Sequence, residues 1–102
     1  MVQFASDKPA SEIMAHLQKL LSDLDCELKV NEKAYTIDAS HARGKDDEGY
    51  VVGMITMHAQ VFVLAERLHL IEIRRGRGDI IEYKALLDKV NAGLTPMRIA
   101  AS

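Results

Sequence analysis

The residues whose chemistry stands out most are gathered in the stretch Arg74–Leu86, which reads RRGRGDIIEYKAL. Its arginines suit anionic partners, because a guanidinium group forms paired hydrogen bonds with phosphate or carboxylate. Arg43 and Lys45 would join them if the polar loop that carries these two residues folds over the same edge of the sheet. The predicted site for an acidic lipid, an acidic peptide or another protein is therefore Arg67, Arg74, Arg75, Arg77, Arg43 and Lys45. The alternative is that these residues only keep a strand end and a turn soluble.

The same stretch contains a Gly-x-Gly pattern and the adhesion tripeptide Arg-Gly-Asp. A dinucleotide-binding loop needs a third glycine inside a parallel strand–helix–strand unit. Here only one helix, and no further strand, is predicted after the Gly-x-Gly pattern. Asp79 and Glu82 have the spacing of a helix N-cap and its third residue, so the Asp79 carboxylate would occupy N–H groups that a bound anion needs. We interpret Gly76 and Gly78 as turn residues with positive φ and predict no cofactor. Nothing else in the sequence supports an adhesion role for so short a motif.

Other candidate chemistry is sparse. The four histidines, His16, His41, His58 and His69, lack metal-ligand spacing, and the nearest approach to a site would be His58 opposite His69 on paired strands. No Ser-His-Asp set can be placed from sequence order, so we predict neither a metal site nor catalytic residues. Cys26 is the single cysteine, which excludes an intrachain disulfide and predicts a buried structural thiol.

The composition is that of one soluble domain over residues 1–102, with 48% hydrophobic and 27% charged residues. The formal net charge is −2, so nothing global favours nucleic acid or an anionic membrane. Val51–Leu64, the longest nearly apolar stretch, is too short to span a bilayer, which needs about 20 residues. We therefore expect a cytoplasmic protein with peripheral membrane contact at most.

A helix is predicted from near Pro9 to Leu24, with Ser6 or Asp7 as its cap. Its apolar positions fall on one stripe, Ile13, Leu17, Leu20, Leu21 and Leu24. A second helix is predicted from Asp79, with Gly93 ending it in a left-handed conformation. Its stripe consists of Tyr83, Leu87, Val90 and Leu94, supported by Ile80 and Leu86. The tail Met97–Ser102 has no clear assignment.

Between the helices, apolar and polar residues alternate in short runs typical of half-buried strands. The four predicted strands are Cys26–Val30, Tyr35–Ala39, Tyr50–Leu64 and Leu68–Arg75, with a polar loop over Ser40–Gly49. Helices at both ends of an antiparallel sheet predict an α+β fold: a four-stranded antiparallel sheet with an N-terminal and a C-terminal helix packed on one face. The other face would stay partly open, with Thr36 and Asp38 exposed on it.

Three stretches resemble the kinase-associated C-terminal domain, which is found in relatives of AMP-activated kinase, in checkpoint kinases and in plant calcineurin-B-like-interacting Ser/Thr kinases. FASDKPASEIM (Phe4–Met14) is similar to the family's entry into its first helix. LIEIRRGRGDIIEYKALLDKVNAGL (Leu70–Leu94) is similar to its closing strand, basic turn and helix, and Tyr50–Glu66 matches its long third strand. The resemblance extends over nearly the whole chain.

This resemblance implies a non-catalytic regulatory domain of a Ser/Thr protein kinase, and none of the kinase signature motifs occurs in the chain. Implied partners are the kinase catalytic domain in cis, through autoinhibition, and an acidic phospholipid or a regulatory protein. Two alternatives stay open: a small-ligand-binding or enzymatic α+β domain with a pocket between sheet and helices, and a homodimer joined through the open sheet face. Buried polar residues converging from both layers would favour the first.

Overall fold

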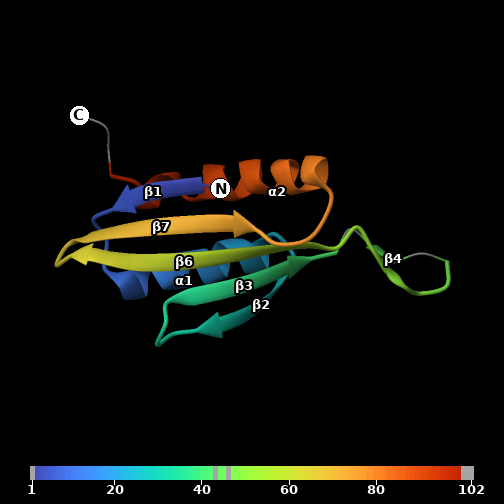
Figure 1. The fold of residues 1–102 in the computed structure, drawn as a ribbon, viewed down its shortest axis with the longest axis horizontal. Helices are drawn as coiled ribbons and strands as arrows, with labels where there is room; N and C mark the ends of the chain where they lie inside the picture. Colours follow the sequence, from blue (N-terminus) through green and yellow to red (C-terminus); the bar gives the residue numbers. More distant parts are fainter. Residues whose placement is uncertain (1, 43, 46, 100–102) are drawn as a thin grey trace.

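The structure, a computed structural model, describes residues 2–42, 44–45 and 47–99 (Figure 1). In chain order the elements are β1 (Val2–Ser6), α1 (Ala10–Asp23), β2 (Cys26–Asn31), β3 (Thr36–His41), β4 (Gly44–Lys45), β5 (Val51–Val52), β6 (Ile55–Ala65), β7 (Leu68–Arg75), α2 (Ile80–Gly93) and the short 3₁₀ helix η1 (Thr95–Met97). The main sheet has the order β1-β7-β6-β3-β2, and every neighbouring pair is antiparallel. The predicted α+β class is confirmed.

The predicted number of strands is wrong, because the main sheet has five. The additional strand is β1, which pairs along β7 with Val2 opposite Ile73 and Phe4 opposite Ile71. Residues 2–6 do alternate between buried and more exposed positions, as a strand with one covered face must. Five residues containing an alanine and a serine carry little β signal of their own, so the strand depends on the edge that β7 offers.

The predicted strand Tyr50–Leu64 is also wrong as one continuous element. Gly53, with φ of 67°, separates the two-residue strand β5 from the eleven-residue strand β6. Strand β5 pairs with β4, which lies in the predicted polar loop, and the two form a small hairpin. Figure 1 shows this hairpin extending beyond the end of the main sheet instead of folding back over it.

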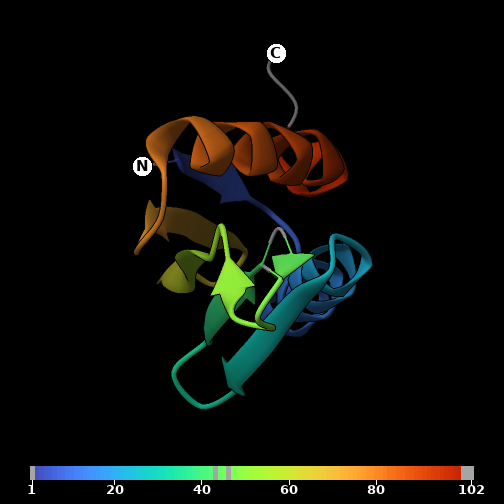
Figure 2. The ribbon, with the colours of Figure 1, turned by 90° about the vertical axis from the view of Figure 1, so that its right-hand side faces the viewer.

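The core lies between one face of the sheet and the two helices (Figure 2). Strands β6 and β7 contribute the buried alternate residues, which include Met57, Ala59, Val61, Ile71 and Ile73. Helix α1 buries its predicted stripe through Ile13, Leu17 and Leu21, and α2 does so through Tyr83, Leu86, Val90 and the following Leu94. The stripe predicted for α2 needs one correction: Ile80 is exposed.

Two predicted helix ends also need correction. Pro9 is the N-cap of α1 and no side chain caps the helix, because Ser6 is a buried strand residue whose hydroxyl accepts a hydrogen bond from the Lys8 N–H at 3.2 Å. Gly93 is the last residue of α2 and its φ is not positive. A Cβ on Gly93 would lie 2.3 Å from Leu20 Cδ1, so a larger residue there would require the Leu20 side chain on α1 to move.

Candidate functional site

The turn between β7 and α2 is tied to β6 through Thr56. The Gly76 N–H donates to the Thr56 carbonyl at 2.7 Å, and the Arg77 N–H donates to the Thr56 hydroxyl at 2.6 Å. The Thr56 N–H in turn donates to the Arg77 carbonyl at 2.9 Å. Two residues of the turn thus face one residue of β6, the arrangement of a β-bulge. The backbone that carries the arginines is therefore held in place.

The two glycines of this turn serve different purposes. Gly78 has φ of 122°, and a Cβ there would lie 2.8 Å from the Met54 carbonyl oxygen. The prediction of positive φ is confirmed for Gly78 and wrong for Gly76. A Cβ on Gly76 would lie 2.2 Å from Thr56 Oγ1, so that glycine makes room for the threonine hydroxyl.

Asp79 is the N-cap of α2, as predicted. Its side-chain Oδ2 accepts a hydrogen bond from the Glu82 N–H at 2.9 Å. The carboxylate also places a negative charge at the positive end of the helix dipole. This N–H of the first turn is therefore already bonded within the chain.

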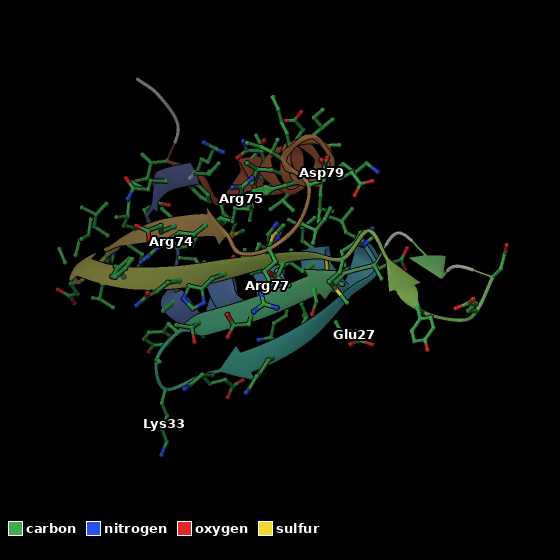
Figure 3. The ribbon with its side chains drawn as sticks, turned by 45° about the vertical axis from the view of Figure 1, so that its right-hand side comes forward. Glu27, Lys33, Arg74, Arg75, Arg77 and Asp79 are labelled. Atoms are coloured by element: carbon green, nitrogen blue, oxygen red, sulfur yellow. The ribbon has the colours of Figure 1, made fainter. Side chains whose placement is uncertain are left out.

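The adjacent arginines Arg74 and Arg75 project to opposite sides of β7 (Figure 3). Arg74 lies on the open face, where its Nε donates to Glu72 Oε1. Arg75 follows on the helix side, where its charge acts on the Tyr83 phenol of α2. Burial raises the pKa of Tyr83, and Arg75 opposes that shift. The alternation of a strand thus separates these two predicted ligands.

The remaining predicted site residues lie elsewhere. Arg77 is in the turn after β7, apart from the other two in Figure 3. Arg67 is in the turn between β6 and β7, at the opposite end of β7, where it lines a hollow with Lys8 and His69. Arg43 lies outside the described residues, and Lys45 is described only by its backbone in β4. The described arginines therefore do not meet at one point.

A network of polar side chains on the open face was not predicted from the sequence. Gln3 Nε2 donates to Glu72 Oε2 at 2.8 Å, and Arg74 donates to the other oxygen of the same carboxylate. The hydrogen bond from Gln3, followed by that from Arg74, lowers the pKa of Glu72. In the next row, Asp38 Oδ1 and His58 Nδ1 are 2.7 Å apart. Only the register, which places Asp38 opposite His58 and His58 opposite Arg74, shows that these residues are neighbours.

The buried polar residues do not form a catalytic or ligand-binding centre. Ser6 and His69 face each other on the covered side of the sheet, whereas Glu72 lies on the open side. His58 is on the open side too, so it cannot share a metal ion with His69. Within residues 2–42, 44–45 and 47–99, no group of three or more His, Cys, Asp or Glu residues has metal-binding geometry. Burial, helped by the Asp25 charge, raises the pKa of the half-buried Cys26 thiol, which makes it a poor nucleophile.

The chain is similar in sequence to parts of plant protein kinases. No family model matches the chain. It is 32% identical over 87 residues, or 85% of its length, to CBL-interacting serine/threonine-protein kinase 2 of Arabidopsis thaliana. It is 29% identical over 85 residues, or 83% of its length, to CBL-interacting protein kinase 26 of Oryza sativa subsp. japonica. The chain spans 18% and 16% of the lengths of these two relatives.

The fold has solved counterparts as well. The adenylate sensor from AMP-activated protein kinase, in a crystal structure complexed with ATP, superposes with a TM-score of 0.70 at 13% identity. The superposition covers 90% of this chain and 94% of the other. The resemblance to a kinase-associated regulatory domain is confirmed. The matched part of the kinases is their regulatory region and not their catalytic domain.

At the end of the domain that carries the β7–α2 turn, apolar side chains are exposed. Ile80 and Ile81 open α2 with 64% and 77% of their surface exposed. Met54, whose carbonyl contacts Gly78, is exposed as well. Arg75 and Arg77 precede these residues in the chain, so basic and apolar groups occur together here. No helix among the described residues is long and apolar enough to cross a membrane.

Proposed function

We propose that this chain is the non-catalytic regulatory domain of a Ser/Thr protein kinase and that it acts by binding the catalytic domain in cis. The observation that carries the proposal is the match to a CBL-interacting kinase at 32% identity over 85% of the chain. The chain would hold the catalytic domain in an inactive state, and a ligand that prefers the released chain would shift the population toward the active one.

The distribution of charge supports a protein partner ahead of a purely anionic one. Arg74 is already bonded to Glu72, and Asp38 is bonded to His58 in the neighbouring row. The open face therefore presents both signs of charge in fixed positions. Such a surface recognises complementary charges on a protein, which gives specificity and register more than raw affinity.

The test adds the chain to the isolated catalytic domain of CBL-interacting kinase 2 and measures phosphorylation of a substrate peptide. Saturable inhibition is expected. Reversing one open-face charge, in the variant Asp38→Lys, should weaken inhibition about tenfold, since a like charge then opposes the partner. The matched control makes the same change on α2, with Asp88→Lys, and should inhibit like the wild type. An absence of both binding and inhibition at high chain concentration would refute the proposal.

A second candidate partner is an acidic phospholipid surface. The observation that favours it is the exposure of Ile80 and Ile81 directly after Arg75 and Arg77. Apolar side chains enter the headgroup region, and each basic residue near an anionic surface contributes about 1 kcal/mol. In this proposal the domain is cytoplasmic and binds membranes peripherally, through a few charges whose effect falls with added salt.

Vesicle sedimentation distinguishes this candidate. Binding to phosphatidylcholine vesicles should increase when phosphatidylserine is added, and the triple variant Arg74/Arg75/Arg77→Ala should lose most of the increase. A control that removes the same total charge from dispersed positions, Lys33/Arg67/Lys84→Ala, should retain it. Equal binding by the wild type and the Arg74/Arg75/Arg77 variant would remove the lipid proposal and leave the kinase-domain proposal standing.

A further inference from the structure

The two edges of the main sheet differ in whether the chain itself covers them. Strand β1 forms one edge, where the Ile99 N–H donates to the Ala5 carbonyl at 3.0 Å and the Arg98 guanidinium lies 4.4 Å from the centroid of the Phe4 ring. The segment after η1 therefore covers part of that edge. Strand β2 forms the other edge, and within the described part of the chain no strand pairs with its outer side (Figure 1). An unpaired edge offers a row of backbone N–H and C=O groups to another strand.

The β2 edge is regular and held in place. β2 pairs with β3 without a register shift over all six of its residues, Cys26–Asn31. The Asn31 Oδ1 accepts hydrogen bonds from the N–H groups of Lys33 and Ala34, both at 3.1 Å, which fixes the turn into β3. The strand contains neither a proline nor a bulge, two features that protect many natural edges. Little ordering is therefore needed when another strand pairs with it.

Two opposite charges remain available on this strand. Glu27 and Lys29 are exposed, and Leu28 between them is half-buried on the helix side. Within the described residues neither charged group takes part in an ion pair. Lys29 lies opposite Asp38 of β3, but that carboxylate is already bonded to His58 at 2.7 Å. A lysine on an edge discourages pairing with an arbitrary strand, so a strand that pairs here must bring a negative charge to this position.

The order of these charges makes β2 complementary to itself. When two copies pair antiparallel with a two-fold axis at Leu28, Glu27 of each copy lies opposite Lys29 of the other. On the helix side, Cys26 then lies opposite Val30, and Leu28 opposite Leu28. Moving the axis by one residue in either direction places two lysines or two glutamates opposite each other. An axis between two residues places charged side chains opposite apolar ones, so one register is favoured.

We propose that β2 is a self-association edge, through which two copies of this domain pair antiparallel about Leu28. The main sheet then continues from one copy into the other, with the helices of both copies on the same side. The contact uses the edge of the sheet and leaves its open face accessible. It goes beyond the proposed regulation of a kinase and does not depend on it.

The size of the contact sets the expected strength of the dimer. Pairing along one strand buries less surface than the roughly 1,200–2,000 Å² of a stable interface, so the dimer should be weak. The test is analytical ultracentrifugation of the chain from about 10 µM to about 1 mM, the range suited to weak association. The wild type should pass from monomer to dimer, and added salt should weaken the association.

Reversal of single charges tests the register. Glu27→Lys and Lys29→Glu should each weaken dimerisation about tenfold, because both unlike pairs of the dimer become like pairs. The matched control is Lys84→Glu, which makes the same change of charge on α2, and it should dimerise like the wild type. Both exposed β2 positions tolerate the change without loss of the core, which circular dichroism checks.

A mixture of the two single variants gives the decisive result. In the mixture one copy carries two positive charges and the other two negative charges, so a heterodimer should form at least as tightly as the wild-type dimer. The double variant Glu27→Lys/Lys29→Glu should also dimerise like the wild type, since the order of the charges is reversed in both copies. A chain that stays monomeric at the highest concentration would overturn the inference. So would a mixture that associates no better than either variant alone, or equal weakening by Lys84→Glu and Lys29→Glu.

Discussion

The two faces of the main sheet are built from the same strands and differ completely in chemistry. On β7, Ile71 and Ile73 are buried under the helices, whereas Glu72 and Arg74 bond to each other on the open side. One residue along the chain therefore moves a side chain from core to surface. The comparison explains why Arg74 and Arg75, adjacent in sequence, do not act as one basic cluster.

The two faces also have different roles, one in stability and the other in recognition. The covered face stabilises the fold by burial, because its side chains leave water entirely. The open face contributes less stability per contact, because Arg74, Asp38 and His58 stay partly in water and ion pairs near the surface are worth about 0–1 kcal/mol. Its fixed arrangement of Gln3, Glu72 and Arg74 is better suited to recognising a partner.

Truncation of one residue on each face tests this comparison with the largest expected effect. Ile71 is fully buried, so Ile71→Ala should lower the free energy of unfolding by about 2–5 kcal/mol. Gln60 lies on the open face of β6 opposite Glu72, and Gln60→Ala should change it by less than about 0.5 kcal/mol. Urea denaturation followed by circular dichroism measures both. Similar losses would show that the open face carries more of the stability than its exposure indicates.

A smaller effect is expected where β7 leaves the sheet. Gly78→Ala forces a side chain into positive φ and against the Met54 carbonyl, so it should destabilise by about 1–3 kcal/mol. Gly44→Ala is the matched control, because a Cβ there meets nothing within 4 Å and φ is not positive. The same denaturation experiment applies. If Gly78→Ala is as stable as the wild type, the turn is free to change its path.

Local patterns in the sequence were sufficient to predict most of the covered face. The spacing of Ile13, Leu17 and Leu21 indicated the buried stripe of α1, and the spacing of Asp79 and Glu82 indicated the cap of α2. Strand β1 could not be predicted in this way, because its pairing joins residues about 70 positions apart. Gln3 and Glu72, for example, are separated by 69 positions.

The candidate site was harder to predict than the fold, although the sequence was enough to predict that its arginines lie apart. At about 3.3 Å per residue, the seven-residue step from Arg67 to Arg74 on a strand is roughly 23 Å, so these arginines could not converge. Alternation likewise separates Arg74 from Arg75. The open-face network gave no sequence signal either, since Gln3, Asp38, His58 and Glu72 come from β1, β3, β6 and β7 and meet only in the folded chain.

The smallest expected effect is the contribution of the open face to the pH dependence of stability. The bonds from Gln3 and Arg74 lower the pKa of Glu72 in the folded chain. A carboxylate of this kind stabilises the fold above its unfolded pKa, about 4.3, and the contribution is lost as pH falls through the lower folded value. Glu72→Gln should therefore lose less stability than the wild type when the pH falls from 6 to 3. Urea denaturation at each pH measures the free energy of unfolding.

Two further variants make the result specific to this carboxylate. Gln3→Ala removes the hydrogen bond that lowers the pKa of Glu72 most, so it should reduce the pH dependence in the same direction but less than Glu72→Gln does. Glu27→Gln removes a carboxylate from the exposed strand β2 and should retain the wild-type profile (Figure 3). If Glu72→Gln and the wild type lose equal stability on acidification, the open-face network does not favour the ionised carboxylate. The contrast between the two faces would then rest on burial alone.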